Sequence, residues 1–188
     1  APSSAVAPSS PSSSQRDEYT IAVRVVGDGT ERIAALRPGT RVAFEGPYGT
    51  LTGAKRTRPG MLMIGAGAGV APLTALLEGE SFAPGEAILL TRDHDEHERM
   101  RSDAIRRLVR ERGLIHYALD GRRAPGGGWM PASHSGWPGA ELLRFVAPDI
   151  AERDVFLCGP GPWMDSLRAD LRRAGVPADR IHDESFTI

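Results

Sequence analysis

Three glycines stand at alternate positions in the middle of the chain, as Gly65, Gly67 and Gly69. Within residues 61–77 they follow an apolar run of strand length and precede an apolar helical pattern, in which Pro72 fits the first turn. Glycine lets the backbone approach a ligand closely, and the start of a helix offers free N–H groups and a positive dipole end. The stretch is therefore predicted to cradle a phosphate or pyrophosphate.

The same pattern has a purely structural interpretation. Its third glycine falls one residue earlier than in the Gly-x-Gly-x-x-Gly of dinucleotide folds. A chain with 22 glycines among 188 residues also produces such a pattern by chance at an appreciable rate. A tight strand-to-helix turn in an α/β sheet is the alternative to a nucleotide cradle.

Arg92 follows the apolar run 87–90 and is itself followed by Asp93. After the second strand of a dinucleotide fold, an arginine accommodates the phosphate of NADP, whereas an acidic residue binds the ribose of NAD. A guanidinium offers bidentate hydrogen bonds to phosphate, and Thr91 adds a donor. We expect NADP(H) in preference to NAD(H). The alternative is an exposed charge cluster, since residues 93–101 are dense in both signs.

Cys158 is the single cysteine, which excludes an internal disulfide and argues against a cysteine zinc site. No base stands beside it in sequence, so its thiol is not expected to act as a nucleophile and could be a buried structural thiol. His94 and His97 are spaced like helical metal ligands. Without a third partner they are expected on a solvated face, and no metal site is predicted.

Composition sets broad limits on the class of protein. Hydrophobic residues make up 40 % and charged residues 25 % of the chain, which is typical of a globular protein with a buried core. The net charge of −1 gives no reason to expect nucleic acid as a partner. The sequence contains no apolar run of membrane-spanning length and no secretion signal, so we expect a cytoplasmic chain.

Strands that alternate with helices after residue 60 predict an α/β fold with a doubly wound parallel sheet. The predicted strands are 61–65, 87–90, 114–119, 154–158 and 180–188, and the predicted helices are 70–79, 93–112, 140–145 and 163–174. Residues 120–138, with Trp129 and Trp137, are interpreted as a loop. Ligands of such sheets bind beyond the carboxyl ends of the strands, where the glycines, Thr91-Arg92 and 158–160 are all expected.

The first third of the chain differs from the rest in composition and in its pattern of apolar residues. Residues 1–18 are rich in Ala, Pro and Ser and are predicted to be a disordered loop or linker. Residues 19–59 contain two alternating strand patterns, 19–26 and 41–45, around a short helical pattern at 30–37. Two strands are too few for a stable sheet, so 19–59 is interpreted as part of an antiparallel domain and 60–188 as a complete α/β domain.

The order of these pieces resembles the ferredoxin–NADP⁺ reductase superfamily, whose members pair a flavin-binding antiparallel barrel with a nucleotide-binding α/β domain. The resemblance covers about residues 19–188, and the C-terminal end is similar to the ferric reductase and NADPH oxidase branch. The residues that carry it are Gly46-Pro47-Tyr48-Gly49, Gly65 to Leu73, Thr91-Arg92, Cys158-Gly159-Pro160 and Glu184-Ser185-Phe186.

The resemblance implies a role for each of these motifs. The pyrophosphate loop would be formed by Gly65, Ala66, Gly67, Gly69 and Pro72. Thr91 and Arg92 would face the adenosine 2′-phosphate. Cys158, Gly159 and Pro160 would lie beside the nicotinamide, with Glu184 nearby, and Phe186 would cover the flavin ring. Cys158 and Phe186 are thus the candidate catalytic residues. Simple packing is the alternative for Tyr48 and for Phe186.

One departure from the family pattern concerns the flavin. The signature Arg-x-Tyr-Ser is absent, and so are most barrel strands. We therefore expect a fragment of a longer reductase, with FAD bound in the intact protein, NADPH as donor, and haem, iron–sulfur or ferric iron as acceptor. A haem domain in the membrane is one expected partner upstream, which would place the protein at the cytoplasmic face. The alternative function is a nucleotide-binding module that senses redox state without catalysis.

Overall fold

The computed structural model describes residues 21, 23, 25, 27–45, 49–126 and 128–186, the last of them without its side chain. Five parallel strands form one sheet in the order β3-β2-β1-β4-β5. They are β1 (Met61–Ala66), β2 (Ala87–Arg92), β3 (Ile115–Ala118), β4 (Asp154–Pro160) and β5 (Ile181–Phe186). The predicted parallel α/β sheet is confirmed, with the glycine-bearing strand β1 at its centre.

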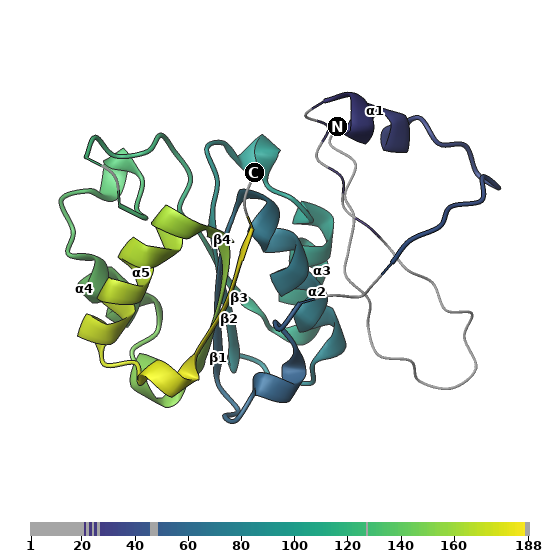
Figure 1. Ribbon diagram of the computed structural model, residues 1–188. Coiled ribbons are helices and arrows are strands. Elements are labelled where there is room, and N and C mark those ends of the chain that lie inside the picture. The colour runs from purple at the N-terminus through teal and green to yellow at the C-terminus, as the bar shows by residue number, and fades with distance from the viewer. Residues whose placement is uncertain are drawn as a thin grey trace.

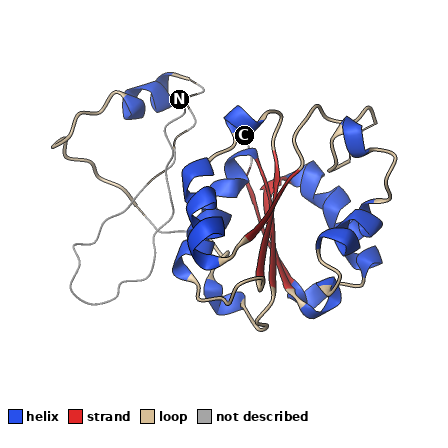
Figure 2. Cartoon of the chain, turned by 180° about the vertical axis from the view of Figure 1, so that it is seen from behind, coloured by secondary structure: helices blue, strands red, loops and turns tan. Residues whose placement is uncertain are grey.

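Helices cover both faces of the sheet (Figures 1 and 2). On one face lie α2 (Val70–Gly79) and α3 (Ser102–Arg112), and on the other α4 (Gly139–Val146) and α5 (Gly161–Ala174). Glycines in the left-handed conformation end two of them, Gly113 after α3 and Gly175 after α5. The predicted stop of the last helix at Gly175 is confirmed.

Two separate cores result from the alternation of side chains along the central strands. Leu62 and Ile64 point into the core under α4 and α5, whereas Met61 and Met63 point into the core under α2 and α3. Every residue of β1 and β2 is buried, as expected for parallel strands that are covered on both sides. The continuous apolar runs of the sequence therefore have a direct structural cause.

The predicted helix over 93–112 is too long. The helix α3 begins only at Ser102, and residues 93–101 form a loop with a short 3₁₀ turn at 96–98. The side chain of Asp95 accepts a hydrogen bond from the His97 N–H (2.8 Å), and Arg101 adopts a positive φ of 63° just before the helix. Asp95 thus offers the backbone a partner outside a helix, which explains why the charged segment forms a loop.

The strand predicted over 41–45 is also absent, because in the described part of the chain no neighbouring strand pairs with it. The helix predicted over 30–37 is present as α1 (Asp28–Ala34). Only residues 21, 23 and 25 of the strand predicted over 19–26 are described, and none belongs to a strand. Residues 1–18 and the motif residues Gly46, Pro47 and Tyr48 lie outside the described residues.

Candidate functional site

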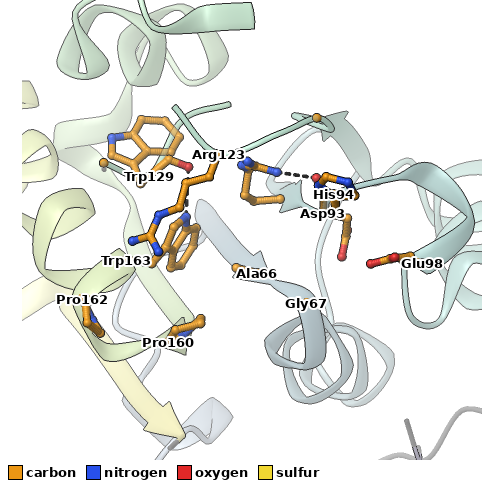
Figure 3. A pocket seen from close by; sticks show the side chains of 13 residues that line it. Ala66, Gly67, Asp93, His94, Glu98, Arg123, Trp129, Pro160, Pro162 and Trp163 are labelled. Atoms are coloured by element: carbon orange, nitrogen blue, oxygen red, sulfur yellow. Dashed lines mark hydrogen bonds between the residues drawn. The ribbon is translucent and has the colours of Figure 1, made fainter. Parts of the chain in front are cut away.

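A cavity of about 330 Å³ lies over the carboxyl ends of the central strands. Ala66 and Gly67 line it where β1 ends, and the stretch Arg92–His94 lines it where β2 ends. Pro160 contributes from the end of β4 (Figure 3). The cavity therefore lies at the predicted edge of the sheet, at the point between β1 and β4 where the strand order reverses, which is where ligands of this sheet type bind.

The turn between β1 and α2 is built by its glycines. Gly65 is still part of β1, and residues 67–69 form a 3₁₀ turn that leads directly into α2 at Val70. Gly67 has a positive φ of 54°, which suits glycine. A Cβ on Gly69 would lie 2.1 Å from the carbonyl oxygen of Cys158, so only glycine allows this approach. No described side chain caps the start of α2, whose Val70 N–H donates to the Gly67 carbonyl within the 3₁₀ turn, so it is the positive end of the helix dipole that faces an anion here.

The strand register brings four of the predicted site residues into one row. Gly65 pairs with Thr91 on one side and with Cys158 on the other, and Cys158 pairs with Glu184. The Cys158 side chain belongs to the core under α2 and α3. The row shows that motifs more than a hundred residues apart in the chain meet at one edge of the sheet, as the parallel arrangement predicted.

Thr91 and Arg92 leave opposite faces of β2, because they are adjacent in a strand. The Thr91 side chain is fully buried, and its hydroxyl lies 3.0 Å from Nε2 of His116. Burial, followed by the charge of Arg99, lowers the pKa of His116 to about 4, so this imidazole is neutral at pH 7. Only Arg92 of the two lines the cavity. This arrangement favours Arg92 over Thr91 as a group that contacts a ligand.

A network of charged side chains holds the chain after β2. Nε of Arg99 lies 3.6 Å from Oδ2 of Asp93, and a second nitrogen of Arg99 forms an ion pair with Asp120. The backbone N–H of Gly121 donates to the carbonyl of Asp93 (3.1 Å). Asp93 is consequently fixed at the rim of the sheet, where it also lines the cavity.

Cys158 is a buried thiol and not a thiolate. Burial, and then the charge of Glu184, raises the pKa of Cys158 to about 12. This protonation state excludes a nucleophilic role at neutral pH and agrees with the interpretation of an unreactive thiol. Its neighbour Pro160 lines the cavity, so the end of β4 contributes to both the core and the site.

The end of β5 is joined to the segment before the sheet. The carboxylate of Glu184 accepts hydrogen bonds from the backbone N–H groups of Thr50 (2.9 Å) and Leu51 (3.2 Å). Leu51 packs against the core under α2 and α3. The predicted motif residue Gly49 lies against the same carboxylate, with a φ of 115°. The side chain of Phe186 is outside the described residues, so its shielding role stays a prediction.

The sequence interpretation did not identify several residues of the cavity. Trp129 lies in the segment 120–138, which was interpreted as a loop of unassigned function, yet its side chain is buried. Its Nε1 donates a hydrogen bond to Oδ2 of Asp170 on α5 (2.9 Å). Trp163 of α5 donates to the Trp129 carbonyl (3.0 Å). Arg123 lies beside these two tryptophans in the cavity (Figure 3). In the sequence, the only indication that Trp129 is buried was that a large apolar residue stands in a glycine-rich loop.

The two histidines singled out in the sequence both lie in the loop 93–101 that follows β2, but they face different surroundings. His94 lines the cavity, whereas His97 is exposed and lies 3.8 Å from the Glu96 carboxylate. Within the described ranges there is no group of three or more His, Cys, Asp or Glu side chains that could hold a metal ion. No helix in that same part of the chain is long and apolar enough to cross a membrane.

Curated proteins of stated role match the chain over most of its length. The ferredoxin reductase component of 3-ketosteroid-9-alpha-monooxygenase from Mycolicibacterium smegmatis is 30 % identical over 178 residues, which is 90 % of this chain and 46 % of that protein. The ferredoxin–NAD(+) reductase component of the alkene monooxygenase system from Xanthobacter autotrophicus is 27 % identical over 175 residues, 90 % of this chain and 52 % of that protein. The chain thus spans about half the length of these relatives.

Among solved structures, the CS-b5R domains of human Ncb5or in the NAD⁺ form superpose with a TM-score of 0.65 at 20 % identity, covering 98 % of this chain and 55 % of that one. This likeness shows the fold. No family model matches the chain.

The parallel sheet and the cavity at its switch point define a dinucleotide-binding α/β domain. The relatives allow a closer assignment. The chain belongs to the ferredoxin reductase-like family of FAD- and NAD-binding oxidoreductases. The resemblance seen in the sequence is confirmed at this level, while the ferric reductase branch stays a prediction.

Proposed function

We propose that this chain is the pyridine-nucleotide half of a flavin-dependent oxidoreductase, which passes hydride from NAD(P)H to FAD. The observation that carries the proposal is the turn 67–69, which leads into the uncapped start of α2 at the edge of the cavity. A pyrophosphate at this turn would lie close to its backbone and be stabilised by the positive end of the helix dipole. The names of the relatives, which are reductase components, support the same function.

The cavity and the row of paired residues suggest how a dinucleotide would lie. Its adenosine end would occupy the cavity beside Arg92 and Asp93, and its nicotinamide end would cross the turn toward Cys158 and Glu184. Glu184 holds the segment at residues 49–51, which we propose leads to the flavin domain. The two cofactors would then meet at the end of β5, where Phe186 is proposed to cover the flavin.

The residues of the chain would act by binding and orientation. When bound, reduced nicotinamide supplies a hydride and the flavin accepts it. The glycine turn would hold the pyrophosphate, and the buried neutral thiol of Cys158 would provide an apolar wall that excludes water. The electrons would then pass to a haem, iron–sulfur or ferric iron acceptor, on a partner protein or a membrane domain. The names of the relatives favour an iron–sulfur protein.

Titration calorimetry with NAD⁺ and NADP⁺ tests the proposal on this chain. The wild type is expected to bind at least one of them, and Gly67→Val is expected to abolish binding while the fold stays intact, because a β-branched residue at a φ of 54° displaces the turn. Gly79→Val, at the other end of α2 with no atom within 4 Å of an added Cβ, is the matched control. Unchanged binding by Gly67→Val would contradict the cradle.

The catalytic part of the proposal needs the full-length protein. Anaerobic addition of NADH or NADPH is expected to bleach the absorbance of bound flavin. Nucleotide binding without any flavin reduction would instead support the redox-sensing module.

A further inference from the structure

Two loops from neighbouring strands line different sides of the cavity. The loop after β2 contributes Asp93, His94 and Glu98, and the loop after β3 contributes Gly121 and Arg123. In Figure 3 the acidic residues lie on one side of the cavity, whereas Arg123 lies beside the tryptophans on the other. The shape of the cavity therefore depends on how these two loops are held relative to each other.

Arg99 connects the two loops through a pair of carboxylates. Its Nε lies 3.6 Å from Oδ2 of Asp93, at the start of its own loop, and its Nη2 forms an ion pair with Asp120, which directly precedes Gly121 in the other loop. A backbone hydrogen bond from Gly121 to the Asp93 carbonyl (3.1 Å) joins the same loops. Arg99 is not among the described residues that line the cavity, so it would affect a ligand only through the residues it holds.

This charge cluster is largely removed from water. The side chain of Arg99 is 12 % exposed and that of Asp93 is 2 % exposed. Oδ1 of Asp120 is buried and has no hydrogen-bond partner in the part of the chain that the structure describes. Removal of one partner from a buried ion pair leaves an uncompensated charge, which is costly. Without Arg99 the two loops would therefore be expected to rearrange.

The same two carboxylates act on Arg92. This arginine lines the cavity, and its guanidinium donates to the backbone carbonyl of Asp93. Burial lowers the pKa of Arg92, while the negative charges of Asp93 and Asp120 raise it. Arg99 thus shares with Arg92 the attraction of both carboxylates, and in its absence both would act on Arg92 alone.

We propose that Arg99 is a positioning residue of the nucleotide site, which fixes the two loops relative to each other and leaves Arg92 available to an anionic ligand. The inference rests on the proposed function, because it takes the cavity to be the place where a nucleotide binds. It applies equally to either pyridine nucleotide, since the charge cluster acts on the shape and the charge of the cavity.

Arg99→Met removes the charge and keeps a side chain of similar length. Titration calorimetry with NAD⁺ and with NADP⁺ is expected to show at least about tenfold weaker binding of whichever nucleotide the wild type binds. Arg99→Lys retains the charge and is expected to bind more tightly than Arg99→Met. Arg101→Met is the matched control, because the Arg101 side chain is similarly buried (15 % exposed) but pairs with Glu78 on α2, away from the cavity lining. Its affinity should match that of the wild type, even where thermal unfolding shows a comparable loss of stability.

Asp120→Asn tests the same connection from the other loop. The Asp120 side chain is 27 % exposed, so this variant keeps the test valid if Arg99→Met does not fold. It is also expected to weaken binding, and the double variant should bind no more weakly than Arg99→Met, because the two residues act as one pair.

Four results would overturn the inference and leave the proposed function intact. They are unchanged affinity in Arg99→Met and Asp120→Asn, no recovery in Arg99→Lys, an equal loss in Arg101→Met, and losses that add in the double variant. A wild type that binds neither nucleotide would overturn the proposed function and this inference with it.

Discussion

The backbone at Gly69 contacts the backbone at Cys158 so closely that a Cβ on Gly69 would lie 2.1 Å from the Cys158 carbonyl oxygen. One residue belongs to the turn after β1 and the other to the end of β4. The contact therefore sets the position of the proposed pyrophosphate seat relative to the proposed nicotinamide wall. A shift of the turn at Gly69 would therefore displace the end of β4 at Cys158, and a shift of Cys158 would displace the turn.

Gly69→Ala is expected to displace this turn, because the added methyl group cannot be accommodated against backbone atoms. Nucleotide affinity should fall at least about tenfold, since the first N–H groups of α2 would no longer converge on one point. Gly79→Ala, an alanine at a position open to solvent in the same helix, should leave affinity unchanged. Calorimetric titration measures both, and equal affinity of Gly69→Ala and wild type would contradict the contact.

Cys158 should resist alkylation in the folded protein. With a pKa of about 12, roughly one thiol in ten thousand is ionised at pH 8, and the side chain is also buried. Because the chain has a single cysteine, mass spectrometry after iodoacetamide treatment reports on this site alone. The same reagent should modify the urea-unfolded chain rapidly. Fast modification of the folded chain at pH 8 would contradict the assignment of an inert thiol.

Asp154 should make stability depend on pH. Burial alone would raise the pKa of this carboxyl, but hydrogen bonds from the N–H groups of Thr57 (2.5 Å) and Arg58 (2.7 Å) outweigh burial and lower it. A lowered carboxyl pKa stabilises the fold above the ordinary value of about 3.9, and the stabilisation is lost as the pH falls through the lowered pKa. Asp154→Asn is therefore expected to reduce the free energy of unfolding at pH 7 by about 1–3 kcal/mol.

The pH dependence separates this effect from a general packing defect. Urea unfolding of wild type and Asp154→Asn should give a difference that narrows as the pH falls below about 4, because the carboxyl then takes up a proton in the unfolded wild type before it does so in the folded protein. Asp103→Asn, at a side chain 96 % exposed, should match the wild type throughout. A difference that stays constant down to low pH would show that the charge of Asp154 is not responsible.

Glu184→Ala should loosen the segment that precedes the sheet. Without the carboxylate, the N–H groups of Thr50 and Leu51 lose their acceptor, so their hydrogen exchange should accelerate severalfold while the amides of β4 stay protected. Glu111→Ala, which removes a carboxylate exposed on α3, serves as the control. Hydrogen exchange read by mass spectrometry measures each segment, and unchanged exchange at 50–51 would show that Glu184 does not hold it.

The parallel sheet could be predicted because its strands leave a strong pattern. Met61 to Ile64 and Ala87 to Leu90 are apolar at every position, since they are covered on both faces. Gly113 ends α3 and Gly175 ends α5, and the sequence predicted the helix end at Gly175. The shared edge of the glycines, Arg92 and Cys158 followed from the parallel arrangement alone.

The remainder depends on contacts distant in sequence. The helix was predicted over 93–112 from apolar residues at helical spacing between Met100 and Val109. Residues 93–101 form a loop instead, where Asp95 accepts from the His97 N–H and Arg99 forms an ion pair with the distant Asp120. Trp129 belongs to the core because Asp170 on α5 accepts its N–H, a partner that no local pattern reveals. Residues 41–45 alternate as a strand does, but in the described chain no other strand lies beside them to pair with. The strand predicted from this alternation was therefore wrong.

The central position of β1 has a consequence for how the protein is made. Met61 to Gly65 pair with Asp154 to Cys158, so the glycine turn reaches its final geometry only after the last third of the chain has been synthesised. Under the proposed function, a nucleotide would stabilise the finished domain but not a nascent chain that still lacks β4. Premature termination before Cys158 would leave the glycine turn without the backbone contact that fixes Gly69.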